Sequence, residues 1–154
     1  MQKSFELDIS NLDENKILEL NNFCLNFNKK KEYTLIPIFT KVFKVFSNKK
    51  KKNIHNICFE SLKDIINLIN PWITNDILNI ILTEMNSSTK DFIKIYGLKL
   101  ISYLADKNPE QIKHNLINLI TPISGYLYNP KKIVSKLAEE TLTNIIKCNG
   151  NKDL

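Results

Sequence analysis

The sequence predicts an all-α fold, a right-handed α-solenoid of three helical hairpins with one additional helix at the N-terminal end. Three observations support this fold class. Segments with apolar residues at helical spacing follow one another from residue 13 to residue 148. Similar features recur at intervals of about 40 residues, which is typical of stacked helical repeats. Glycine occurs only three times in 154 residues, and this scarcity disfavours folds that are rich in tight turns.

The first helical segment is "DENKILELNNFCLNF" (13–27). Its apolar residues share one face, and its acidic residues Asp13 and Glu14 suit the positive end of the helix dipole. The residues of the apolar face are Ile17, Leu20, Cys24 and Phe27. Polar residues cover the rest of the helix, so we expect residues 13–28 to form a capping helix.

Three helical hairpins follow, and together with the capping helix they form a predicted single domain over residues 1–154. Repeat 1 covers 33–70, with helices at 33–47 and 54–69 and a lysine-rich loop between them. Repeat 2 covers 73–107, with helices at 74–85 and 91–106. Repeat 3 covers 109–149, with helices at 108–128, where Asn108 is the expected N-cap, and 130–148.

The hairpins share internal landmarks. The apolar pairs that begin at Leu35, Ile77 and Leu119 lie 42 residues apart, twice in succession. A proline recurs inside two first helices, as Pro37 in "LIPIF" and Pro122 in "LITPI", and predicts a shared bend. A helical hairpin of this length with a bent first helix is the HEAT/armadillo pattern.

The stretch "NPKKIVSKLAEETL" (129–142) carries the HEAT resemblance most clearly. It resembles the HEAT signature because Val134, Ala138 and Leu142 follow an Asn-led loop at four-residue steps. We expect this stripe to pack against its own hairpin partner, with Ala138 allowing close approach. Gly97, inside the predicted helix 91–106, marks a second close helix crossing because glycine is otherwise unfavourable in a helix.

A longer stretch, "VSKLAEETLTNIIKCNGNKDL" (134–154), is similar to a repeat in the N-terminal HEAT domain of fungal-type translation elongation factor 3. That resemblance implies a non-catalytic domain that contacts the ribosome, while separate ATP-binding cassettes supply the ATPase activity. This chain has no G-x-x-x-x-G-K-[ST] loop, and its glycines are only Gly97, Gly125 and Gly150. The ATPase role therefore does not carry over, and ribosome binding does.

No catalytic, metal or cofactor site is expected. The two histidines, His55 and His114, fall in different repeats, and His55 with Cys58 supplies fewer ligands than zinc requires. The same pair lacks an orienting group for nucleophilic catalysis. Trp72 follows Pro71 at an inter-repeat turn, and we expect it to be a packing plug.

Lysines are the most informative charges. Net charge is +6, and every basic side chain apart from histidine is lysine, which argues against bidentate recognition by arginine. Loops within stacked hairpins fall on one edge, so the lysines in and near these loops form a candidate polyanion-binding edge. They are Lys49, Lys50, Lys51, Lys52, Lys90, Lys94, Lys131, Lys132 and Lys136. The alternative is that these lysines only keep loops solvated.

The sequence thus favours a non-enzymatic HEAT-repeat interaction module, a stand-alone adaptor that binds the ribosome or translation machinery. The alternatives are a nucleic-acid-binding module that uses the lysine edge without reading sequence, and a self-associating structural protein. Repeat 3 leaves Ile133 and Ile146 outside its inner stripe, so this end is a candidate contact for a protein partner or a second copy. An odd number of cysteines and an N-terminus without an apolar signal segment favour the cytoplasm, with no membrane partner.

Overall fold

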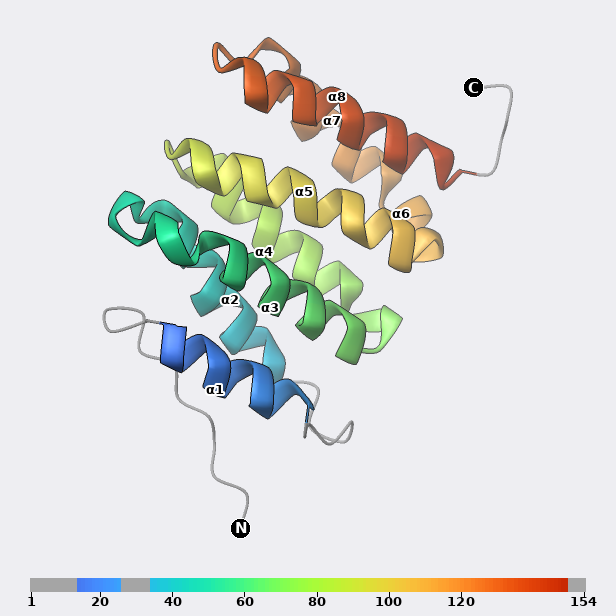
Figure 1. Cartoon of the computed structure of the whole chain (residues 1–154). Helices are drawn as coiled ribbons and strands as arrows, with labels where there is room; N and C mark the ends of the chain where they lie inside the picture. The colour runs from blue at the N-terminus through green and yellow to red at the C-terminus, as the bar shows by residue number, and fades with distance from the viewer. Residues whose placement is uncertain (1–13, 26–33, 150–154) are drawn as a thin grey trace. The chain divides into compact units, whose positions relative to one another are not determined.

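The computed structural model describes residues 14–25 and 34–149, and these residues form helices joined by short turns, with no strand among them (Figure 1). The all-α class is therefore confirmed. The chain divides into two compact units, Met1–Asn70 and Pro71–Leu154. This boundary coincides with the predicted junction between repeats 1 and 2. The assignment of residues 1–154 to a single domain of three repeats stays a proposal.

In the first unit, helix α3 packs against both α1 and α2. The elements are α1 (Glu14–Leu25), α2 (Leu35–Lys44), the 3-10 helices η3 (Val45–Ser47) and η4 (Lys49–Ile54), and α3 (His55–Leu68). Helix α1 buries Ile17 and Leu20, as the expected apolar face requires. Asp13 and Phe27 lie outside the described residues, and the structure describes the backbone of Cys24 but not its side chain.

Aromatic side chains fill the core of the first unit. The rings of Phe39 and Phe43 stack with centroids 6.3 Å apart, and Phe46 meets Phe43 edge-on at 5.7 Å. All three side chains are fully buried. The ring of His55 packs edge-on against Phe46 at 5.3 Å and joins this cluster. The aromatic cluster thus fixes the point at which η4 leads into α3.

The second unit contains the remaining helices. They are η5 (Pro71–Ile73), α4 (Thr74–Ser87), α5 (Asp91–Lys107), α6 (Pro109–His114), α7 (Leu116–Gly125), η6 (Tyr126–Tyr128) and α8 (Lys132–Lys147). Helix α5 packs against α4 and α8, and α8 also packs against α7. Gly97 of α5 is buried, and a Cβ built there would lie 2.5 Å from Sδ of Met85 in α4. The close crossing expected at Gly97 is therefore confirmed.

Three local predictions need correction. The expected helix 108–128 is divided, because Asn115 adopts a non-helical backbone (φ −103°, ψ 9°) between α6 and α7. Pro37 does not bend α2, since it lies in the first turn of that helix, where its missing N–H would have no intrahelical acceptor. Asn108 precedes α6, but its side chain does not cap that helix and instead donates to Oγ1 of Thr74 at 3.1 Å.

The buried stripe of α8 also differs from its prediction. Val134 and Ala138 are fully buried, but Leu142 is only half-buried, and the stripe continues through Thr141 and Ile145. Thr141 donates its hydroxyl proton to the carbonyl oxygen of Leu98 at 3.2 Å. This bond places the face of α8 that carries Thr141 against α5, the second helix of the preceding hairpin. The expectation that the stripe packs against its own hairpin partner was thus incomplete.

Candidate functional site

Helices α5 and α8 run in the same direction, and this geometry brings together lysines that are distant in sequence. Thr141 bonds to Leu98 near the middle of both helices, and Sγ of Cys148 lies 3.5 Å from the carbonyl oxygen of Ala105 toward their C-terminal ends. Both pairs are 43 residues apart, so the two helices are in parallel register. Figure 1 shows α5 and α8 beginning on the same side.

The loops that precede α5 and α8 are therefore neighbours at one end of the second unit. Tyr126, in η6, donates its hydroxyl proton to Oδ1 of Asn86 at 2.8 Å, which ties η6 to the last turn of α4. Nζ of Lys94 lies 5.7 Å from the centroid of the Tyr126 ring, within the range of a cation–π contact. We call this end the lysine end and define it by Lys90, Lys94, Lys131, Lys132 and Lys136.

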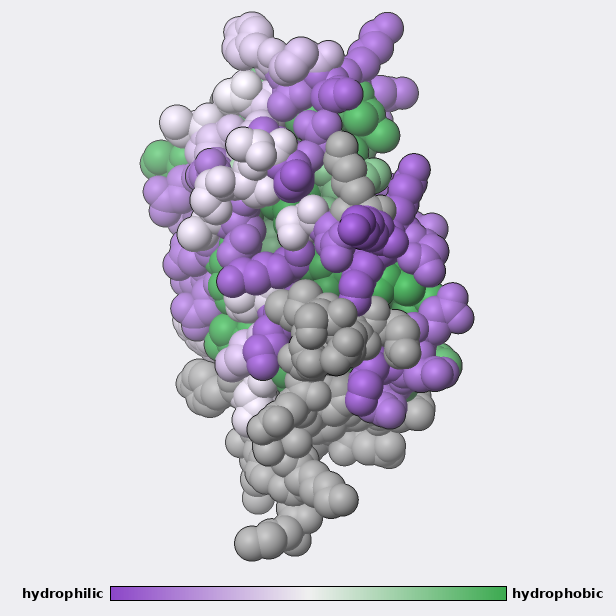
Figure 2. All heavy atoms as spheres, turned by 90° about the vertical axis from the view of Figure 1, so that its left-hand side faces the viewer, coloured by the Kyte–Doolittle hydropathy of each residue, from purple (hydrophilic) through white to green (hydrophobic). Residues whose placement is uncertain are grey.

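Most side chains of the lysine end are open to solvent. Lys90, Lys131, Lys132 and Lys136 are exposed, and Lys94 is half-buried. Two acidic residues near these lysines, Glu84 and Asp91, are half-buried, whereas Glu139 and Glu140 are exposed and share a hollow with Lys136. Figure 2 looks onto the side from which α5 and α8 begin, and hydrophilic side chains cover much of that view toward the top. Positive charge therefore faces outward at Lys90, Lys131 and Lys132.

The lysine run of the first unit is folded rather than a loop. Residues 49–54 form η4, and Oδ1 of Asn48 accepts a hydrogen bond from the backbone N–H of Lys50 at 3.0 Å. Lys50 and Lys52 are exposed, whereas Lys51 is half-buried. Lys49 belongs to η4, but its side chain is outside the described part of the structure. The continuity of these lysines with the lysine end of the second unit stays a prediction.

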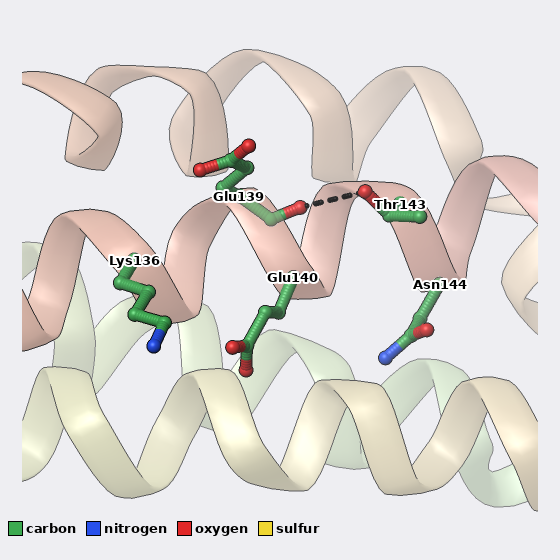
Figure 3. A pocket seen from close by; sticks show the side chains of 5 residues that line it. All are labelled: Lys136, Glu139, Glu140, Thr143 and Asn144. Carbon is green, nitrogen blue, oxygen red and sulfur yellow. Dashed lines mark hydrogen bonds between the residues drawn. The ribbon is translucent and has the colours of Figure 1, made fainter.

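The candidate partner-contact residues of repeat 3 lie at the two ends of α8. Ile133 is 56% exposed and Ile146 is 36% exposed. Between them an open hollow of about 470 Å³ is lined by Lys136, Glu139, Glu140, Thr143 and Asn144. Figure 3 shows Lys136, Glu140 and Asn144 projecting on one side of α8 and Glu139 on the other. The two isoleucines are thus separated by a polar surface, and their role as a contact stays a prediction.

Cys58 and His55 do not have the protonation states that a nucleophilic cysteine and its histidine partner need. Burial raises the pKa of the Cys58 thiol to about 12, so the thiol is protonated at neutral pH. Only the thiolate is a strong nucleophile. Burial also lowers the pKa of His55 below its usual value. In the described part of the chain, no group of three or more His, Cys, Asp or Glu side chains could hold a metal ion.

Two aromatic side chains of the second unit are largely exposed. Trp72 is 78% exposed, so it is not the packing plug we expected. Tyr128, for which the sequence pattern made no prediction, is 89% exposed at the lysine end. In the sequence, "YLYNPKK" (126–132) places Tyr126 and Tyr128 a few residues before the pair Lys131 and Lys132, but this spacing does not indicate which ring is exposed.

A comparison with known families matches residues 8–142 to the family described as EF3 N-terminal HEAT repeat. The chain belongs to this family. Its α-solenoid fold class follows from that membership, as the resemblance of residues 134–154 implied. HEAT repeats mediate protein interactions and are not catalytic, so this region is a HEAT-repeat interaction module.

Curated relatives agree with the family. The chain is 24% identical over 127 residues to elongation factor 3 of Pneumocystis carinii. The aligned region covers 82% of this chain and 12% of that protein. It is 29% identical over 105 residues to elongation factor 3B of Saccharomyces cerevisiae, covering 68% of this chain and 10% of that protein. It is 28% identical over 123 residues to elongation factor 3 of Phytophthora infestans, covering 80% of this chain and 12% of that protein.

The EF3-like chain therefore spans about a tenth of the length of these relatives. No solved structure matches it. Among the residues that the structure describes, no helix has both the length and the apolar character needed to cross a bilayer.

Proposed function

We propose that this chain is a non-catalytic adaptor that binds the ribosome through ribosomal RNA phosphates. The observation that carries the proposal is the parallel register of α5 and α8, which gathers Lys90, Lys131 and Lys132 at one exposed end. The relatives with matching sequence are elongation factors, which makes the ribosome the first partner to test.

The charge chemistry fits a phosphate backbone better than base-specific contacts. Lysine is a flexible point charge that neutralises a phosphate without fixed geometry. Each neutralised phosphate releases counterions, so binding through the lysine end should weaken steeply as salt rises. Such contacts position a protein on RNA and do not read sequence.

The test is co-sedimentation with ribosomes from Saccharomyces cerevisiae over a range of KCl concentrations. The triple variant Lys90→Gln, Lys131→Gln, Lys132→Gln should bind more weakly. Its plot of log affinity against log salt should be shallower by roughly 0.7 per lost phosphate contact.

The matched control is the triple variant Lys99→Gln, Lys107→Gln, Lys113→Gln. It removes the same charge from the same unit at exposed lysines outside the lysine end. The control should keep the affinity and slope of the wild type. Wild-type protein that does not co-sediment at any salt concentration, or equal losses in both variants, would overturn the proposal.

A second candidate function is contact with a protein partner or a second copy through repeat 3. The exposed side chains of Ile133 and Ile146 favour it. Sedimentation velocity of wild type beside Ile146→Lys tests it, because only a contact that uses this end would be lost in the variant.

A further inference from the structure

We propose that the ring of Tyr128 is a stacking platform for an unpaired base, so that the lysine end binds single-stranded RNA. The inference rests on the proposed function, because it names the kind of RNA that the lysines would hold. Its basis is the exposure of one tyrosine ring within a charged and conformationally fixed turn.

The exposure of Tyr128 sets it apart from other tyrosines of the second unit. Its side chain is 89% exposed, whereas Tyr96 is buried and Tyr103 and Tyr126 are half-buried. A tyrosine ring carries a large apolar face that water solvates poorly. A nucleobase has a π-face of matching size and can cover such a ring without any requirement for its sequence.

The backbone that presents Tyr128 is fixed by hydrogen bonds on both sides. The N–H of Asn129 donates to the carbonyl oxygen of Tyr126 at 3.1 Å, and the N–H of Lys131 donates to Oδ1 of Asn129 at 2.9 Å. Pro130 restricts φ between these bonds. The Tyr126 hydroxyl anchors the same segment to Asn86. The turn that carries the ring is therefore preorganised, so little backbone entropy is lost when a base covers the ring.

Cations lie next to the ring in sequence and across the neighbouring loop. Lys131 and Lys132 follow Tyr128 by three and four residues and are exposed. The parallel register of α5 and α8 brings Lys90 to the same end. Phosphates on either side of a stacked base would therefore meet ammonium groups, which is the arrangement used by proteins that bind single strands.

A duplex does not satisfy this arrangement. Bases inside an A-form helix are stacked on one another, and their faces are closed to a protein ring. Lysines alone would bind duplex and single strands through the same phosphates. The tyrosine thus adds a preference for loops, bulges or ends whose bases are unstacked.

The experiment compares an unstructured single-stranded RNA with an A-form RNA duplex of equal length. Affinity is measured by fluorescence anisotropy for wild type, Tyr128→Ser, Tyr128→Phe and the control Trp72→Ser. Trp72 is exposed at the opposite end of the second unit, where Thr74 bonds to Asn108, and no lysine lies within four residues of it.

Tyr128→Ser should bind the single strand about 5- to 150-fold more weakly, which corresponds to the loss of one stacked base. Its affinity for the duplex should not change. Tyr128→Phe keeps the ring and should stay within about twofold of wild type, and so should Trp72→Ser. A 2-aminopurine in the single strand should be quenched by wild type and less so by Tyr128→Ser.

The outcomes separate this inference from the proposed function. If wild type binds neither RNA nor ribosomes, both fail. If wild type binds both RNAs and Tyr128→Ser changes neither affinity, the stacking platform is overturned while the lysine end stands. If Tyr128→Ser weakens ribosome binding but not single-stranded RNA binding, Tyr128 contacts a ribosomal protein, and the inference is again overturned.

Discussion

At the scale of single residues, Gly97 shows how one missing side chain allows two helices to approach. A Cβ at this position would lie 2.5 Å from Sδ and 2.7 Å from Cγ of Met85, which is fully buried. Glycine costs about 1 kcal/mol relative to alanine inside a helix. Its presence in the middle of α5 is therefore explained by the space that it leaves for Met85.

We expect Gly97→Ala to lower the free energy of unfolding by about 1 kcal/mol. Overpacking costs ~1–3 kcal/mol, and the better helix propensity of alanine offsets up to about 1 kcal/mol of that loss. Met85 can shift to some extent because methionine is flexible, which keeps the overpacking cost below the upper end of this range. Urea denaturation followed by circular dichroism measures the change.

Gly125 provides the matched control for this prediction. Nothing lies within 4 Å of a Cβ built there, and its backbone is already helical (φ −60°, ψ −32°). Gly125→Ala should therefore leave stability unchanged or raise it by up to about 1 kcal/mol. A stability gain in Gly97→Ala as large as that in Gly125→Ala would refute the close-crossing explanation.

At the scale of elements, helices with a strong apolar period were predictable and local breaks were not. The helices expected at 54–69 and 91–106 correspond to α3 (His55–Leu68) and α5 (Asp91–Lys107). Their buried faces repeat every three or four residues, and this pattern is a local property of the sequence.

The break between α6 and α7 depends on contacts that the sequence does not display. Helices are often interrupted at proline or glycine, but the residue at this break is an asparagine, Asn115. Instead its side-chain amide donates to the carbonyl oxygen of Gln111 at 2.8 Å and to Oδ1 of Asn75, 40 residues away. Thr141 is similar, because its burial requires the carbonyl oxygen of Leu98 as a distant partner. Sequence periodicity cannot anticipate hydrogen bonds between repeats.

The lysine positions at the candidate site were predictable and the adjoining aromatic ring was not. The spacing of hairpins placed Lys90 and Lys131 at comparable loops, and the parallel register of α5 and α8 brings these two loops together. Exposure of Tyr128 depends on the turn at Asn129 and Pro130, whose conformation is set by backbone hydrogen bonds. A composition-based search for charge does not detect such a ring.

Helix α3 begins at a buried histidine whose charge state affects stability. Nε2 of His55 lies 3.3 Å from the carbonyl oxygen of Asn48, at the start of η4. Burial is the largest cause that lowers the pKa of His55, and nearby Lys52 acts in the same direction. The backbone carbonyl groups of Asn48 and Val45 oppose this shift.

Stability should therefore fall as the pH drops below about 6.5, the pKa of histidine in an unfolded chain. The unfolded chain then takes up a proton that folded His55 resists, and the loss continues until the pH reaches the lowered folded pKa. The slope from one such group is at most about 1.4 kcal/mol per pH unit. Urea denaturation at a series of pH values measures it.

Replacing the ring with a side chain that does not titrate isolates this contribution. His55→Gln should be less stable than wild type near neutral pH and should lose the additional pH slope below about 6.5. Equal slopes in wild type and His55→Gln would show that the buried ring is not the source.

At the scale of the whole molecule, the single-domain assignment of residues 1–154 can be tested through the cooperativity of unfolding. The described helices form two compact units that meet at residues 70 and 71. In repeat proteins, the stability of each repeat includes a term from its neighbour, so a change in one repeat is felt in the next. The chain behaves as a single domain only if the free energy of interaction between the units is large enough to prevent either unit from unfolding alone.

We expect hydrogen exchange followed by mass spectrometry to show one cooperative transition. Peptides from α2 and α3 should lose protection at the same urea concentration as peptides from α4, α5 and α8, because coupled repeats unfold together. Gly97→Ala lies in the second unit, yet it should shift both sets of peptides by the same free energy. Gly125→Ala should shift neither set toward lower stability. If Gly97→Ala lowers protection only in peptides from residues 71–149, the two units unfold independently and the chain contains two domains.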